Sequence, residues 1–243
     1  FIRNTTDQWV SRECGFRRQS EIPEIWDPVT GEIVSVPVYN QDGKYIKIPL
    51  TLAPYGSYFV VFRKGDSSAI YTNISGPGEN PPLMEFTRNG ILFLEEGNFE
   101  LKNNSGSKKV ENKQNPQIIE GPWKISFTKG WGAPDSTVLP GLTSWTEHKN
   151  KGIKYYSGIG KYQKPFLYEM NGPLSEDERI YIDLGDISEI AEVWMNGQSL
   201  GITWAKPFKF DVTGMIKNGE NILTVEVANT WSNRIIGDAI TGE

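Results

Sequence analysis

Apolar and polar residues alternate in short runs along residues 1–65, with turn residues between the runs. Asp42-Gly43 is a pair that favours a hairpin turn, and the run from Tyr45 to Leu52 that follows it carries apolar residues at every second position from Ile46 onward. The run Tyr58 to Phe62 is almost continuously apolar, which predicts a strand buried on both faces. Strands about ten residues apart with turn chemistry between them predict a β-sandwich over residues 1–65.

Residues 66–116 depart from this pattern. The stretch SGPGENPP interrupts the apolar runs, and KNNSGSKKVENKQNPQ is polar and rich in turn residues. Only Ile91 to Leu94 and Phe99 to Leu101 predict a small hairpin. We therefore expect a linker with a small β element over residues 66–116.

Strand-like runs return over residues 117–243. Ala191, Val193 and Met195 alternate with polar or bulky neighbours, which places them on one face of a strand, and Asn196-Gly197 predicts a type I′ hairpin turn. Helical periodicity is nearly absent, although residues 186–190 and 212–217 could each form one helical turn. The chain is therefore expected to be all-β, with a second sandwich of the jelly-roll type over residues 117–243. Its other expected strands are Trp123 to Phe127, Gly160 to Leu167, Arg179 to Leu184, Lys209 to Val212 and Asn221 to Val227.

Composition and charge narrow the class of protein. The 243 residues carry a formal net charge of −5, which opposes binding to nucleic acid, and no run approaches the ~20 apolar residues of a membrane span. Cys14 is the only cysteine and His148 the only histidine, so an intrachain disulfide and a Cys/His zinc site are excluded. We expect Cys14 to be buried and His148 to lie at the surface. Because the chain starts at Phe1 without Met, we expect a piece of a longer protein whose first sandwich is incomplete at its N-terminus.

No catalytic group identifies itself. Hydrolysis of a glycosidic bond commonly uses two carboxyl groups about 5–10 Å apart. The acidic candidates lie in turn-like sequence, where charged residues are usually solvated, and SGIGKY lacks the spacing of a phosphate loop. These candidates are Glu95-Glu96, the SEDE cluster at residues 175–178, Asp183 with Asp186, and Asp238. No catalytic residue is predicted.

Tryptophan recurs beside amide and charged residues over residues 117–243. Aromatic rings can cover the apolar face of a sugar, while Asn and Arg hydrogen-bond to hydroxyl groups. Strand alternation supplies a competing interpretation, in which Trp194 packs against a neighbouring domain; Trp204 and Trp231 fit both interpretations equally. The predicted carbohydrate-binding residues are Trp204, Trp231, Asn233, Arg234, Trp194 and Asn196.

Several motifs occur together within residues 117–243. They are Asp183-Leu184-Gly185, V-x-x-NG-x-x-LG at residues 193–201, PF-x-x-DVT at residues 207–213, GEN at residues 219–221 and N-x-W-x-NR-x-x-GD at residues 229–238. This combination resembles the galactose-binding-like sandwich of glycoside hydrolases, as found in family 2 and at the C-terminal end of the family 106 α-L-rhamnosidases. The last motif favours the rhamnosidase-like group. In those enzymes another β-sandwich precedes the galactose-binding-like sandwich. Two segments within residues 1–65 are similar to that preceding sandwich, PEIWDPVTGEI and LAPYGSYFVVF.

The resemblance implies a non-catalytic accessory region of a polysaccharide-degrading enzyme, secreted, at the cell surface or in the periplasm of a bacterium. The catalytic carboxylates of such enzymes lie in a (β/α)₈ barrel, and nothing in this chain alternates strand and helix as a barrel does. The implied partners are that barrel and a plant or other polysaccharide. Two alternatives stay open: a purely structural module that packs on the barrel, and an independent adhesion-type β-sandwich protein. Some such sandwiches hold a structural calcium ion, for which the sequence identifies no ligands; no other cofactor is implied.

Overall fold

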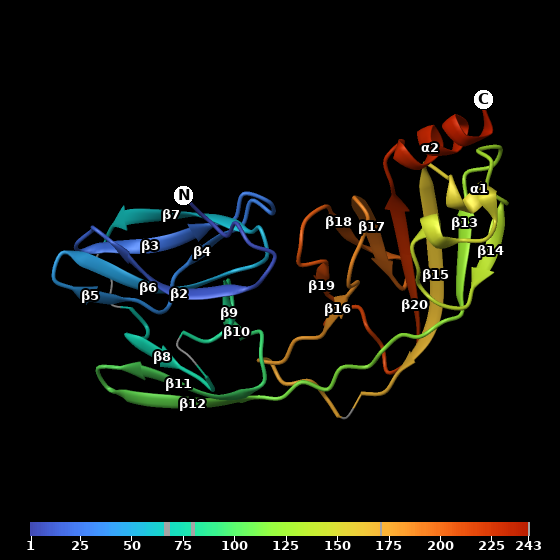
Figure 1. Cartoon of the computed structure of the whole chain (residues 1–243). Helices are drawn as coiled ribbons and strands as arrows, with labels where there is room; N and C mark the ends of the chain where they lie inside the picture. The colour runs from blue at the N-terminus through green and yellow to red at the C-terminus, as the bar shows by residue number, and fades with distance from the viewer. Residues whose placement is uncertain (66–68, 79–80, 171, 243) are drawn as a thin grey trace. The chain divides into compact units, whose positions relative to one another are not determined.

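The computed structural model describes residues 1–65, 69–78, 81–170 and 172–242 and consists almost entirely of antiparallel strands (Figure 1). Strand accounts for 47% of the chain and helix for 7%, which confirms the predicted all-β class. The chain divides into two compact units, Phe1–Pro116 and Gln117–Glu243.

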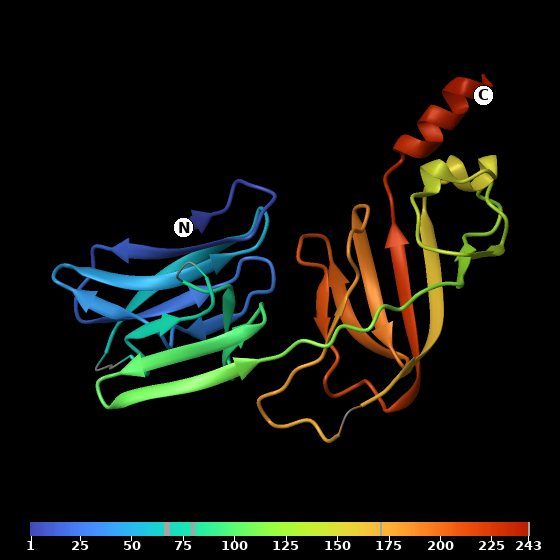
Figure 2. The ribbon, with the colours of Figure 1, turned by 60° about the horizontal axis from the view of Figure 1, so that its bottom comes forward.

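The first unit contains two stacked sheets with a core between them (Figures 1 and 2). One sheet has the order β1-β7-β3-β4, with β1 at Ile2–Arg3, β7 at Ser57–Lys64, β3 at Glu21–Trp26 and β4 at Ile33–Ser35. The other has the order β2-β6-β5, with β2 at Val10–Phe16, β6 at Tyr45–Leu52 and β5 at Asn40–Asp42. The apolar positions of β6 that alternate in the sequence, Ile46, Ile48 and Leu50, all face this core.

The first unit also includes the described residues of the segment that was predicted to be a linker, which corrects that prediction. The strands β8 (Asn73–Ser75), β11 (Gly97–Asn103) and β12 (Gly106–Asn112) form a sheet, and β9 (Met84–Thr87) pairs with β10 (Gly90–Phe93). Phe93 stacks on Phe99 at 3.8 Å between ring centroids, in a cluster with Met84 and Leu101. The polar stretch after Leu101 is the turn and the exposed edge strand of a hairpin, where charged residues are typical.

Strand β7 has one exposed face, so its predicted burial on both faces is wrong. Tyr58, Val60 and Phe62 pack against the core, whereas Phe59 is exposed. The sheet is antiparallel and open on its outer side, and there Phe59 lies opposite Trp26 in register. The continuous apolar run of β7 therefore reflects an aromatic outer face rather than a second buried one.

The second unit is built on a six-stranded sheet of order β14-β13-β15-β20-β17-β18. A pair of short strands, β16 and β19, covers its core, which contains Ile182 and Val212 together with Val193 and Val225. The strands are β13 (Trp123–Phe127), β14 (Ser136–Leu139), β15 (Ile159–Tyr168), β16 (Tyr181–Asp183), β17 (Ile190–Met195), β18 (Gln198–Thr203), β19 (Lys209–Asp211) and β20 (Gly219–Ala228).

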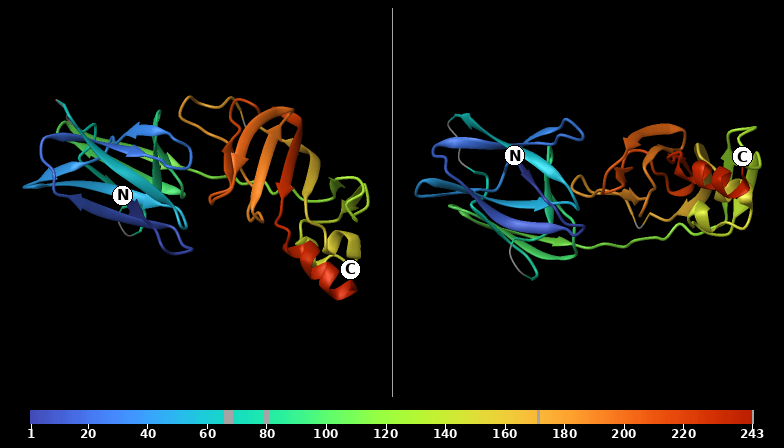
Figure 3. Two further views of the ribbon diagram at one scale, coloured as in Figure 1. Left: turned by 90° about the horizontal axis from the view of Figure 1, so that it is seen from above. Right: turned by 45° about the horizontal axis from the view of Figure 1, so that its top comes forward.

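Three short helices lie at one end of this sheet (Figures 1 and 3). They are the 3₁₀ helix η1 (Trp145–Glu147), α1 (Lys151–Lys154) and α2 (Ser232–Thr241), and α2 follows directly after β20. None of the helices in the described part of the chain is long and apolar enough to cross a membrane. The sequence did not predict α2; residues 186–190, predicted as a helical turn, are irregular until β17 begins at Ile190.

The expectations for β17 and its turn are confirmed. Ala191, Val193 and Met195 are fully buried. Asn196 and Gly197 have φ values of 53° and 82°, and a type I′ turn requires positive φ at both positions. The sequence therefore specifies which face of β17 meets the core and where the strand ends.

Candidate functional site

Two exposed tryptophans lie side by side at the end of the second unit where the helices are. Trp131, in the loop between β13 and β14, is 48% exposed, and Trp231, at the start of α2, is 66% exposed. Their ring centroids are 6.2 Å apart and the ring planes are tilted by 33°. A Cβ atom at Gly158 would lie 3.2 Å from the ring of Trp131, so this ring covers a bare stretch of backbone. We refer to these two residues as the tryptophan pair.

Sequence reasoning identified Trp231 but missed Trp131. Trp131 lies between Gly130 and Gly132, which have φ values of 78° and 94°. A tryptophan between two glycines in a polar loop has few neighbours to bury it. This local signal could have marked Trp131 as exposed.

The segment that carries Trp231 is fixed by side-chain hydrogen bonds to the loop before β15. Asn229 Oδ1 accepts the backbone N–H of Gly158 at 2.9 Å, and Asn229 Nδ2 donates to the carbonyl oxygen of Tyr156 at 2.9 Å. The backbone N–H of Arg234 donates to Ser157 Oγ at 3.0 Å. These three bonds hold the start of α2, and with it the backbone of Trp231, against the loop before β15.

Charged groups lie next to the pair. Arg234 Nε is 2.8 Å from Asp238 Oδ1, one helical turn away, and both side chains are partly exposed. A Cβ atom at Gly132 would lie 3.5 Å from Arg234 Nη1, so the guanidinium group lies near the loop that carries Trp131. Asn233, also a predicted site residue, precedes Arg234 and is partly exposed. Two ring faces beside a carboxylate and a guanidinium group suit a ligand with an apolar face and several hydroxyl groups.

Trp204 lies at the same end of the sheet but on a different strand. It is 55% exposed and follows β18, whose last paired residue, Thr203, lies opposite Ala191. Ala191 in turn pairs with Val227, near the end of β20. Sheet order therefore places Trp204 two strands away from the segment that leads to Trp231.

Trp194 lies on the outer face of the six-stranded sheet. Its ring centroid is 5.8 Å from Lys161 Nζ, a cation–π distance, and Lys161 Nζ is 2.9 Å from Glu226 Oε1. Trp194 pairs with Thr224 in the middle of β20, away from the end where the helices lie. Its half-buried ring already has a partner in its own sheet.

Asn196, the last predicted site residue, is occupied by structural hydrogen bonds. Its Nδ2 donates to the carbonyl oxygen of Met215 and to Asn221 Oδ1, each at 2.9 Å. Its Oδ1 accepts the backbone N–H of Ile222 at 2.9 Å. The amide group of Asn196 thus joins the β17–β18 turn to β20.

The acidic candidates mostly stabilise loops. Glu95 Oε1 accepts the N–H of Leu83 at 2.9 Å, and the backbone N–H of Ser175 lowers the pKa of Glu178 by hydrogen bonding to its carboxylate. Within the described ranges, no three His, Cys, Asp or Glu side chains come together as metal ligands, and structural calcium stays a prediction without a ligand set.

The only histidine and the only cysteine of the sequence, His148 and Cys14, also lie in ordinary structural surroundings. His148 is partly exposed, and its Nδ1 accepts the N–H of Asn150 at 3.0 Å. Cys14 is half-buried, and burial raises the pKa of its thiol. A raised pKa keeps the thiol protonated and poorly nucleophilic at neutral pH.

Comparison with known proteins identifies the second unit. Residues 161–236 match a family model described as the glycosyl hydrolase 2 galactose-binding domain-like family. Residues 161–236, which make up much of the second unit, thus match the galactose-binding-like domain family of glycoside hydrolases. This confirms the resemblance found in the sequence motifs.

Other similarities extend beyond the residues that match the family model. The chain aligns over 97% of its length with 19% of the chain of a rhamnosidase from Novosphingobium sp. PP1Y, with a TM-score of 0.73 and 28% identity. It is 37% identical over 145 residues to a protein of Formosa agariphila named "Putative beta-glucuronidase", and 26% identical over 149 residues to a β-galactosidase of Priestia megaterium. Each of these two alignments covers 58% of this chain. They cover 12% of the Formosa agariphila protein and 13% of the β-galactosidase. The chain thus spans less than a fifth of the length of each of these three proteins.

Proposed function

We propose that this chain is a non-catalytic accessory region of a polysaccharide-degrading, α-L-rhamnosidase-like glycoside hydrolase, and that its second unit binds carbohydrate at the tryptophan pair. The observation that carries the proposal is the exposed pair Trp131 and Trp231 beside Arg234 and Asp238. The similarity of both units to a rhamnosidase supports the choice of enzyme. On this proposal the whole enzyme acts in the periplasm, at the cell surface or outside a bacterial cell, where polysaccharides are found.

The binding mode follows from the geometry of the pair. A sugar ring placed on the two indoles removes apolar surface from water, at about 25 cal/mol per Å². Arg234 and Asp238 supply a donor and an acceptor for adjacent hydroxyl groups, and charged partners make stronger hydrogen bonds than neutral ones. Because the two rings contact each other and the backbone of Trp231 is fixed by hydrogen bonds nearby, the pair would lose less side-chain entropy on binding than two isolated tryptophans.

Affinity gel electrophoresis with rhamnose-, galactose- and glucuronate-containing polysaccharides tests the proposal. Trp131→Ala and Trp231→Ala are each expected to weaken retention by about tenfold. Trp204→Ala is the matched control and should leave retention unchanged. It removes an exposed tryptophan from the same end of the sheet but outside the tryptophan pair. Unchanged retention of a folded double variant of Trp131 and Trp231 would contradict the proposal.

A second candidate function, structural packing against the catalytic barrel, is favoured by helix α2. Its residues Ile235, Ile236 and Ile240 are all exposed, and an exposed apolar helix face commonly marks a contact surface. On this proposal, Ile235→Glu with Ile240→Glu lowers the melting temperature of the whole enzyme but not that of this chain alone. An equal effect on both proteins would instead indicate damage within the chain.

A further inference from the structure

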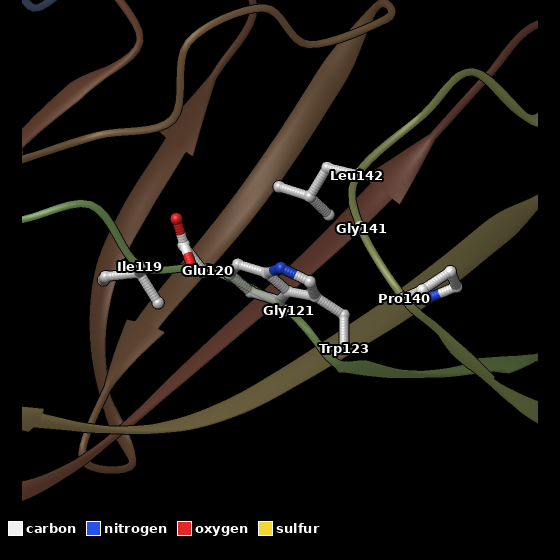
Figure 4. Close-up of a pocket in the computed structure, with 7 residues that line it drawn as sticks. All are labelled: Ile119, Glu120, Gly121, Trp123, Pro140, Gly141 and Leu142. Carbon is white, nitrogen blue, oxygen red and sulfur yellow. The ribbon is translucent and has the colours of Figure 1, made fainter.

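A hollow of about 410 Å³ lies on the second unit beside the start of β13, whereas the loop with Trp131 follows the end of β13 (Figure 4). Two segments form it, residues 119–123 and residues 140–142. The segments approach so closely that a Cβ atom at Gly121 would overlap the carbonyl oxygen of Pro140. The volume lies within the usual ~300–1,000 Å³ of small-molecule sites.

Trp123 forms the rigid floor of this hollow. It is only 5% exposed and meets Tyr162 edge to face, with ring centroids 6.5 Å apart at 82°. Tyr162 Oη in turn accepts the indole N–H of Trp145 at 2.6 Å. The Trp123 ring is therefore held by its own packing, and its orientation does not depend on a ligand.

The indole N–H of Trp123 is an unused donor that faces the hollow. Among the described residues no group accepts a hydrogen bond from it, and it is not one of the buried polar atoms without a partner, so it reaches solvent. Figure 4 shows the indole nitrogen on the side of the ring that faces Leu142. A largely buried ring with an unused donor beside an open hollow is suited to bind an acceptor there.

The other lining groups define the chemistry of the occupant. Ile119, Pro140 and Leu142 provide apolar walls, and Leu142 is 57% exposed. The exposed carboxylate of Glu120 stands at the rim as an acceptor. No Lys or Arg lines the hollow, and Lys164 close by donates Nζ to the carbonyl oxygen of Pro122 at 3.1 Å.

We propose that this hollow is a second carbohydrate site, which binds one neutral sugar residue and disfavours uronic acids. The apolar edge of the sugar lies against Leu142 and Ile119, while its hydroxyl groups accept from the indole N–H of Trp123 and donate to Glu120. A uronate would bring a second negative charge next to the carboxylate of Glu120, and like charges repel. The inference rests on the proposed carbohydrate-binding role of the chain, but it does not require the tryptophan pair.

Ligand-observed NMR on this chain with L-rhamnose, D-galactose and D-glucuronate tests the proposal. Wild type should bind at least one neutral sugar and bind glucuronate at least tenfold more weakly. Gly141→Phe should abolish binding by filling the hollow, because a Cβ atom at Gly141 meets no atom within 4 Å. Leu142→Ala should weaken binding about tenfold, and Glu120→Gln should narrow the difference between neutral sugar and glucuronate. These three positions border open space or are exposed, so the unfolding midpoint should stay within error of wild type.

The double variant Trp131→Ala with Trp231→Ala separates the two proposals. It should lose polysaccharide retention and keep monosaccharide binding. If it loses both, the sugar binds at the tryptophan pair and the hollow proposal fails while the proposed function stands. If wild type binds monosaccharide in the hollow but retains no polysaccharide, the pair fails as a site and the hollow stands. Absence of any neutral sugar signal, tight glucuronate binding, or binding that survives Gly141→Phe would overturn the hollow proposal.

Discussion

Replacing Asn221 with alanine is expected to destabilise the second unit by about 2–4 kcal/mol. Asn221 is 1% exposed, the least exposed of the buried polar residues. Its Nδ2 donates to the carbonyl oxygens of Lys217 at 2.7 Å and Gly219 at 3.1 Å. Its Oδ1 accepts the N–H of Lys217 and the Nδ2 of Asn196, each at 2.9 Å.

The magnitude follows from the groups that the substitution leaves behind. Four hydrogen bonds disappear, and a buried group left without its partner costs ~1–3 kcal/mol. The expected loss of stability is smaller than four such penalties. Lys217 and its neighbours lie near the surface, so their freed backbone groups can hydrogen-bond to water. Asn196 Nδ2 keeps only its bond to the carbonyl oxygen of Met215.

Urea unfolding of the second unit, followed by tryptophan fluorescence, measures this cost. Asn196→Gly keeps the positive φ of the turn while removing the Asn196 side chain, and the double variant with Asn221→Ala then isolates their shared bond. The coupling energy should be about 1 kcal/mol. Asn218→Ala is a graded control, because Asn218 is exposed and, among the residues that the structure describes, its side chain has one hydrogen bond, accepted from the N–H of Met170. A cost for Asn221→Ala as small as that of Asn218→Ala would refute the reasoning.

Two further predictions concern close packing and alkaline pH. Gly121→Ala should cost ~1–3 kcal/mol by forcing Pro140 away, whereas Gly141→Ala should be nearly neutral; differential scanning calorimetry compares them, and equal midpoints would contradict the first expectation. Burial raises the pKa of the Tyr58 phenol far above its ordinary value of about 10, with smaller contributions from nearby acidic groups. Above about pH 10 the Tyr58 phenol loses its proton in the unfolded chain but keeps it in the folded protein. The stability that is fully present below about pH 10 is therefore lost as the pH rises, at up to ~1.4 kcal/mol per pH unit. Urea unfolding at pH 9 and pH 11 should show the loss in the first unit, and Tyr58→Phe should reduce it; an unchanged slope would refute this assignment.

Strand positions follow from the sequence where one face is buried and a turn residue marks the end. Asn196-Gly197 ends β17 because only residues that tolerate positive φ fit a two-residue hairpin, and Val193 shows which face is buried. The same reasoning failed for β7, because Phe59 is apolar yet lies on an open outer face. It also failed for residues 66–116, because the cluster that buries Phe99 includes Val38 and Ile74, which lie well before it in the sequence. The pattern within one strand could not reveal either error, because the burial of a strand face depends on which other strands pack against that face.

The candidate site was predictable in part. Trp231 and Arg234 stand close together in the sequence, but Trp131 joins them only through the fold, from a loop a hundred residues earlier. Helix α2 was missed because its apolar residues do not face the core; it packs instead through Gly237, where a Cβ atom would lie 2.8 Å from Tyr155 Cβ. Its C-terminal signal was present, since Gly242 adopts a φ of 78° and donates its N–H to the carbonyl oxygen of Asp238.

The motifs that identify this domain in the sequence are largely hydrogen-bonding devices. Asn196 and Asn221, from the NG and GEN motifs, bond to each other, and Asn229 fixes the segment before α2. Their side chains are used within the fold, so these motifs identify the architecture and carry no information about a ligand. Trp231 differs, because it belongs to the same set of motifs and yet leaves its ring exposed against Trp131. On the proposed function, the exposed ring of Trp231 is therefore the part of the motif set that would contact a ligand.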